Sequence, residues 1–184
     1  MNLRQLFTVI MVLLALCGSA QKYMTKTGYV YFKSHTDAID IDGSNNKVAA
    51  MFDVSSGEIV AIVLIKAFEL PLATADKHFN EVYMESDAYP KATFKGKFVN
   101  LQNVDINSNE TQELDVEGVL SLHGVDKPFV QKVNISNNKG KLSGTCSMKI
   151  NIDDFGITVP ENVKDRVAKV VDVKVELTLE EVKK

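Results

Sequence analysis

Beyond residue 20, four side chains stand out as possible metal ligands or nucleophilic catalysts: His35, His78, His123 and Cys146. Neutral imidazoles are common zinc ligands, and a thiolate can serve both as a ligand and as a nucleophile. The three histidines are widely separated along the chain, however, and their spacing matches no compact metal motif. The sequence therefore predicts no metal site, and it favours hydrogen bonding to backbone or turn groups as the role of these imidazoles.

Motifs that would support catalysis are equally sparse. Cys146 lies in an alternating pattern typical of a strand, so a small buried apolar side chain is its predicted role. The tripeptide Asp154-Phe155-Gly156 has the letters of the kinase metal-binding motif, but no glycine-rich phosphate loop accompanies it. The acidic pairs Asp153/Asp154 and Glu180/Glu181 are expected to be solvated strand ends rather than catalytic carboxylates. The chain is therefore not predicted to be an enzyme.

The first twenty residues have the layout of a secretory signal peptide, since Arg4 precedes the apolar run Leu6–Leu16 and small residues lead to Ala20. Cleavage after Ala20 is predicted, because lipoprotein processing at Cys17 requires a small residue at the position before it. The apolar run is shorter than the ~20 residues that span a bilayer, and no second such stretch follows. A soluble, exported protein that does not span a membrane is therefore expected.

Length and charge limit what the remaining chain can be. Loss of Arg4 with the leader changes the formal net charge from -3 to -4. A mildly acidic chain lacks the basic surface that binds nucleic acid, so no nucleic-acid partner is predicted. Residues 21–184 are long enough to form one domain with a core that needs no disulfide.

Apolar and polar residues alternate with a period of two in eight segments, which is typical of half-buried strands. In the first four segments the alternating positions include Val30, Phe32 and Ser34; Val48, Ala50, Phe52 and Val54; Ile59, Ala61, Val63 and Ile65; and Ala92, Phe94, Gly96 and Phe98. The fifth runs from Leu114 to Leu122, the sixth from about Pro128 to Ile135, the seventh from Leu142 to Ile152, and the eighth from Val171 to Leu179. Turns at residues 55–57 and 137–140 join neighbouring segments into hairpins.

Two short helical pieces interrupt the strands. A helix from Thr74 to about Met84 is predicted, with Thr74 as its N-cap, and Pro160 begins a further turn or two. Val163 and Val167 of the later piece are expected to face inward. The third strand, predicted from Glu58 to about Phe68, is apolar on both faces, so a helix is expected to cover its outer side.

Eight strands joined mostly by short turns favour an antiparallel sheet that closes into a barrel, because closure removes both exposed edges. A barrel of eight strands is either filled by its own side chains or keeps room for one small ligand. Gly96, Gly118 and Gly144 fall on inward faces, where a missing side chain either eases strand bending or leaves space. The pattern leaves both readings open.

Two blocks of sequence, His78 to Ser86 and Tyr89 to Gly96, closely resemble the YceI-like family of secreted lipid- or polyisoprenoid-binding proteins. Shorter pieces agree in order along the chain: Gly28 to Phe32 resembles the family's opening strand, Gly118 to Lys127 its mid-chain strand and turn, and Asp153 to Ile157 its late segment. The resemblance covers nearly the whole chain after the predicted leader.

The resemblance implies a lipocalin-like barrel whose elongated interior takes up a long-chain isoprenoid or a related amphiphile. It also implies an exported or periplasmic location and brings no cofactor or metal with it. Together with the strand pattern, it predicts an all-β fold with one or two short helices: an eight-stranded antiparallel lipocalin-like β-barrel of residues 21–184.

Aromatic and branched aliphatic side chains are the predicted contacts of such a ligand, because a hydrocarbon is held by buried area, at ~25 cal/mol per Å², rather than by directed bonds. The residues assigned to the walls are Phe32, Phe52, Phe94, Phe98, Leu120 and Leu122, with Phe79 and Tyr83 as a helical lid at one end. The predicted function is to sequester or carry the lipid in the barrel.

Two other functions stay open at this stage. One is a barrel enzyme that acts on a small apolar substrate, with His78 or His123 as acid or base; replacing both with glutamine would abolish turnover in an enzyme and leave a carrier intact. The other is a filled barrel that presents its surface to a protein partner. A homodimer is also left open.

Overall fold

A computed structural model describes residues 21–183, and the predicted signal peptide, residues 1–20, lies outside the described residues. The strands are β1 (Lys22–His35), β2 (Asp40–Asp53), β3 (Glu58–Leu64), β4 (Lys91–Phe98), β5 (Gln112–Leu122), β6 (Val125–Asn138), β7 (Lys141–Asn151) and β8 (Val170–Glu181). The helical segments are the 3-10 turn η1 (Ile65–Ala67), the α-helix α2 (Ala73–His78), the π-helical turn η2 (Phe79–Tyr83) and the 3-10 turns η3 (Leu101–Asn103), η4 (Ile152–Phe155) and η5 (Glu161–Val163).

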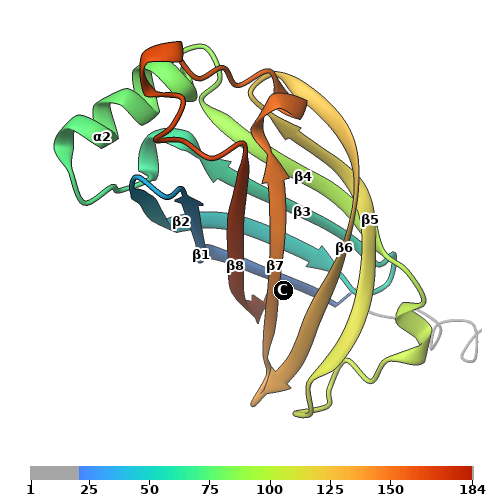
Figure 1. The fold of residues 1–184 in the computed structure, drawn as a ribbon. Coiled ribbons are helices and arrows are strands. Elements are labelled where there is room, and N and C mark those ends of the chain that lie inside the picture. Colours follow the sequence, from blue (N-terminus) through green and yellow to red (C-terminus); the bar gives the residue numbers. More distant parts are fainter. Residues whose placement is uncertain (1–20, 184) are drawn as a thin grey trace, which may run out of the picture.

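The eight strands form a closed barrel in chain order, and every neighbouring pair is antiparallel, β8 with β1 included. Each strand is hydrogen-bonded to the one before it, and the two are joined by a hairpin or a longer connection. The helix α2 lies at one end of the barrel (Figure 1). The predicted all-β, lipocalin-like, eight-stranded architecture is therefore confirmed. None of the helices between residues 21 and 183 has the length and apolar character needed to cross a bilayer.

One end of the barrel is filled by its own side chains, and we call this cluster the plug. It forms at the end of the barrel opposite α2, where every strand except β3 contributes at least one buried side chain. Its buried members are Tyr23, Ala50, Phe52, Phe98, Leu114, Val116, Ile135, Leu142 and Leu179. At this end of the barrel the inward-facing residues are buried, as predicted, and they pack against one another as a solid core.

The helical segment departs from its prediction in two ways. The α-helix begins at Ala73 after Leu72, which makes no side-chain cap, so the predicted Thr74 N-cap is wrong. The segment also packs over the open end of the barrel, where the Phe79 ring stacks on Phe32, instead of covering β3 from outside. The outer face of β3 is accordingly exposed in part, and Leu64 is 49% accessible.

The third strand ends earlier than its apolar pattern predicts. β3 stops at Leu64, whose carbonyl accepts a hydrogen bond from the buried Asn45 amide at 2.9 Å, and η1 follows. Ile65 and Phe68 then turn into the barrel and are buried. An apolar run cannot by itself distinguish a longer strand from a tight turn that buries the same residues, so the boundary was set by tertiary contacts.

The sequence left two roles open for the three inward glycines: to ease strand bending or to leave space in the barrel. The structure shows both. Gly96 on β4 lies opposite Gly118 on β5, and a Cβ on Gly118 would come within 2.5 Å of the Gly96 Cα. A Cβ on Gly144 would instead meet only the Val133 Cγ1, at 3.9 Å. Gly96 and Gly118 therefore allow a close backbone approach, whereas Gly144 leaves space inside the barrel.

Candidate ligand-binding cavity

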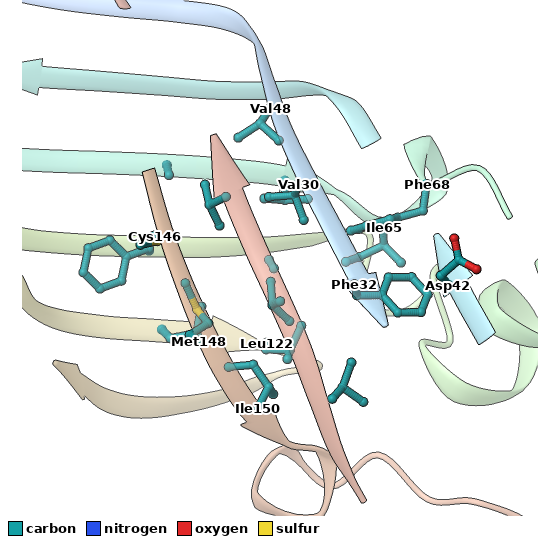
Figure 2. Close-up of a pocket in the computed structure, with 18 of the residues that line it drawn as sticks. Val30, Phe32, Asp42, Val48, Ile65, Phe68, Leu122, Cys146, Met148 and Ile150 are labelled. Atoms are coloured by element: carbon teal, nitrogen blue, oxygen red, sulfur yellow. The ribbon is translucent and has the colours of Figure 1, made fainter. Parts of the chain in front are cut away.

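Above the plug the barrel is hollow, with a cavity of about 740 Å³ that opens at the end carrying α2. Figure 2 shows some of the side chains that line it. This volume lies within the range of roughly 300–1,000 Å³ that is usual for sites holding one small organic molecule. Inward side chains of all eight strands and of α2, η2 and the segment after η5 line it. The interior is therefore neither fully packed nor a continuous channel.

The floor of the cavity is aromatic. Phe52 and Phe98, both predicted as wall residues, belong to the plug and are 2% and 6% exposed. Their rings meet edge to face with centroids 5.1 Å apart, a favoured aromatic geometry. They border the cavity from below and would contact only the deepest part of a ligand.

The open end is narrowed by three phenylalanine rings, which we call the aromatic gate. Phe79 of η2 stacks on Phe32 of β1 at 5.2 Å, and Phe68 meets both rings edge to face at 5.4 and 5.5 Å. Phe32 and Phe79 were predicted from the sequence. Phe68 was missed, because it was assigned to the end of a strand, while its chain reversal after η1 depends on contacts distant in sequence.

The side walls contain the remaining predicted residues. Tyr83, Phe94, Leu120 and Leu122 line the cavity, so the structure brings all eight sequence-predicted side chains to one hollow. Their contact with a ligand stays a prediction. Wall residues on β6, β7 and β8 were not assigned, although the alternation that marked the other strands also marks these: Phe129, Val133, Cys146, Met148, Ile150, Val173, Val175 and Leu177.

Charged side chains that line the cavity occur at its open rim. Asp40 and Asp42 stand on the first part of β2, and Arg166 follows η5. Asp40 is held by ion pairs with Lys33 and His35, which hold the pKa of its carboxyl below the usual value. The interior below the rim is lined by apolar side chains with a few neutral polar ones, so a buried ligand chain meets no charge there.

The three histidines do not converge. His35 pairs with Asp40 at the β1–β2 turn, and His78 lies on the rim. His123 is buried outside the cavity lining, where its Nδ1 donates to the Phe155 carbonyl at 3.2 Å and its Nε2 lies 3.0 Å from Glu85. Between residues 21 and 183 no three His, Cys, Asp or Glu side chains gather closely enough to hold a metal ion.

Cys146 projects into the cavity from β7 (Figure 2), and burial raises the pKa of its thiol to about 11. With this pKa, only about a thousandth of the thiol is ionised at pH 8. The ionised fraction sets the rate of alkylation, because the thiolate is the reactive form. In a chain that begins at Gln21, we expect slow alkylation by iodoacetamide at pH 8, faster by about tenfold for each pH unit until near pH 11. Fast, pH-independent alkylation of the folded protein would contradict this; the chain unfolded in guanidinium provides the reference rate.

These features define a class of protein: an antiparallel, lipocalin-like barrel that is plugged at one end and has an apolar hollow at the other. The YceI-like domain model matches residues 23–179, which is most of the chain, and the protein belongs to that family.

Similar proteins agree with this assignment. A UPF0312 protein of Vibrio cholerae is 24% identical over 141 residues, which cover 72% of this chain and 68% of the relative. Among solved structures, a polyisoprenoid binding domain from Saccharophagus degradans, implicated in plant cell wall breakdown, superposes with a TM-score of 0.77 at 16% identity, covering 89% of this chain and 100% of that domain. Burkholderia cenocepacia BcnA superposes with a TM-score of 0.67 at 19% identity, covering 85% of this chain and 96% of that protein. At these identities the structures share the fold.

Proposed function

We propose that this protein binds an isoprenoid-like or other long-chain amphiphilic lipid in the cavity and sequesters or carries it. The observation that carries the proposal is the hollow of about 740 Å³, whose interior is walled by aromatic and branched aliphatic side chains. A polyisoprenoid binding domain with the same fold supports the isoprenoid class of ligand.

The cavity has the physical means to hold such a chain. Burial of roughly 500 Å² of hydrocarbon contributes about 12 kcal/mol at ~25 cal/mol per Å². Association costs of at least ~4 kcal/mol leave about 8 kcal/mol, which corresponds to a dissociation constant near ~1 μM. No directed bond is needed inside the barrel, which fits a lining that is mostly apolar and contains only a few neutral polar side chains.

The distribution of charge sets the orientation of the ligand. Arg166 is at the rim, and its guanidinium takes part in no ion pair within the described part of the chain. Charged groups are costly to bury in an apolar interior. The polar head of the amphiphile therefore stays at the rim, beside α2 and η5, and its chain points toward Phe52 and Phe98.

The direct test is binding by delipidated protein. A fluorescent geranylgeranyl diphosphate analogue and parinaric acid, a straight-chain polyene fatty acid, are titrated in parallel to compare isoprenoid and unbranched chains. We expect saturable binding of at least one probe with a dissociation constant of about 1 μM. Native mass spectrometry with lipid extraction, on protein purified from its own host, identifies the natural ligand. Absence of binding of both probes, together with absence of co-purifying lipid, would refute the proposal.

Export of the protein is part of this proposal and is supported by the leader-like pattern of residues 1–20. The mature chain would start at Gln21, directly before β1. Intact-mass measurement of protein isolated from the periplasm or medium tests this start; a mature chain that begins at a lipid-modified Cys17 would contradict it.

A further inference from the structure

The barrel wall is incompletely paired between β6 and β7. Their ladder has five residue pairs, from Asn134 opposite Thr145 to Asn138 opposite Lys141. Above this ladder β6 stays paired with β5, and β7 stays paired with β8, but they no longer pair with each other. Figure 1 shows the two strands meeting at their hairpin and diverging toward the end that carries α2. We call the unpaired part, residues 125–133 of β6 and 146–151 of β7, the seam.

Two side-chain hydrogen bonds span the seam, and behind it Phe129 of β6 packs in the same apolar cluster as Met148 and Ile150 of β7. The Gln131 amide donates to the Ser147 carbonyl across it at 3.0 Å, and to the Lys132 carbonyl on its own strand at 3.2 Å. At the upper end, the His123 Nδ1 donates to the Phe155 carbonyl just beyond β7. Single side-chain bonds are much easier to open than a strand ladder, because each is worth only about 1 kcal/mol net.

The other short ladder in the barrel is covered, which sets the seam apart. β2 and β3 share four residue pairs, Ala49 to Phe52 with Ile59 to Ile62. Beyond them the chain of η1 and Phe68 closes the wall, and Ser44 forms a backbone bridge with Glu69. The uneven pairing of the barrel therefore leaves the seam as a stretch of wall that is closed by side chains and not by a backbone ladder.

The cavity extends to the seam from inside. Phe129, Gln131 and Val133 of β6 and Cys146 and Met148 of β7 all line it. The Gln131 amide thus stands between the hollow and the outside at the point where the two strands separate. A ligand chain in the cavity would lie directly behind it.

The outer surface beside the seam is also apolar. Val130 is 64% exposed, the most accessible of the large hydrophobic residues that the structure describes, and Val119 on the neighbouring strand is 42% exposed. Val119 lies opposite Pro128, so the three residues form one patch on the outside of β5 and β6. A hydrocarbon chain that passed through the seam would meet apolar side chains on both sides of the wall.

We propose that the seam is a side opening through which the hydrocarbon tail of the bound amphiphile enters and leaves the barrel, and that Gln131 closes it. The inference rests on the proposed lipid-binding function and concerns the route of that ligand. The head remains at the rim near Arg166, and the tail swings sideways between β6 and β7, so it need not be threaded lengthwise through the aromatic gate.

Reversible bridging of the seam tests this route. Continuing the register of the β6–β7 ladder places Lys132 opposite Ser147, and both are exposed on the outer face. In a Cys146→Ala background, Lys132→Cys and Ser147→Cys are joined by a short bis-methanethiosulfonate linker, and mass spectrometry verifies the bridge. The matched control bridges Asn138→Cys and Lys141→Cys, which already face each other in the paired part of the ladder and do not line the cavity. Parinaric acid binding and its release to phosphatidylcholine vesicles are followed by fluorescence.

We expect the seam bridge to slow both binding and release at least about tenfold, with the dissociation constant changed less than about twofold, since a gate alters rates and not the bound state. Dithiothreitol should restore the rates, and the control bridge should leave them unchanged. Unchanged rates in the bridged seam variant, with normal binding, would overturn the side opening alone. Failure of the unbridged parent to bind parinaric acid and the geranylgeranyl analogue, with no co-purifying lipid, would instead overturn the proposed function, and the side opening with it.

Discussion

Replacement of Gly144 by phenylalanine is expected to weaken binding of a long-chain amphiphile by about 50-fold while the barrel stays folded. The Cβ position of Gly144 faces the cavity, where only the Val133 side chain lies within contact distance, at 3.9 Å. A benzyl group there occupies space that the ligand would use. Loss of roughly 100 Å² of ligand burial costs about 2.5 kcal/mol, which accounts for the predicted change in affinity.

The control for Gly144→Phe is Thr178→Phe on the adjacent strand. Thr178 is exposed on the outer face, next to Leu177, which lies opposite Gly144 across the β7–β8 ladder. The same bulky side chain is thus added at the same level of the barrel but outside it. Titration with the geranylgeranyl analogue measures both variants, and circular dichroism verifies their fold. Equal affinities of Gly144→Phe and the parent would show that the ligand does not occupy this hollow.

The second large effect concerns stability. Gly118→Ala is expected to lower the free energy of unfolding by about 3 kcal/mol and the melting temperature by about 10 °C. The added methyl group would lie 2.3 Å from the Lys95 carbonyl oxygen and 2.5 Å from the Gly96 Cα. These are backbone atoms of the neighbouring strand, so no side-chain rotation relieves the clash, and β4 and β5 must separate.

Gly144→Ala is the matched control for Gly118→Ala, because both glycines face inward on barrel strands. Its methyl group meets open space, so a stability change within about 0.5 kcal/mol is expected. Thermal and urea unfolding measure both variants. A melting temperature of Gly118→Ala within about 2 °C of the parent would show that close approach of β4 and β5 does not require glycine.

The glycine pair also shapes the candidate site. A Cβ on Gly96 would come within 2.5 Å of the Phe94 ring, so this ring lies across the space that a side chain would occupy. Phe94 lines the cavity in this position and meets Phe129 edge to face at 6.4 Å. Because Gly118→Ala forces β4 away from β5, it is expected to displace Phe94 and so to disturb the cavity wall as well as the stability of the sheet.

Much of the fold could be predicted because a strand has a strict period of two. Once Phe94 faces inward, Phe98 on the same strand does so as well, and each strand repeats this logic. The inward positions and the number of strands followed directly, as did the hairpin at Gly140. The eight predicted wall residues all reach the cavity lining for this reason.

The end of β3, the place of α2 and the division of the interior were not predictable in the same way. The sequence marks Phe52 and Phe32 alike as inward, yet Phe52 is packed in the plug and Phe32 stands at the open end. Which level of the barrel is filled depends on how all eight strands taper and bend, a property of the closed sheet and of no single segment.

Residue order thus determined which side of each strand is apolar, since side chains alternate faces independently of their surroundings. Tertiary structure alone decided where the barrel is solid, where it is hollow, and where β6 and β7 separate. Those outcomes depend on register and curvature between strands that are distant in sequence, and such long-range pairing is set by the balance of contacts in the whole closed barrel.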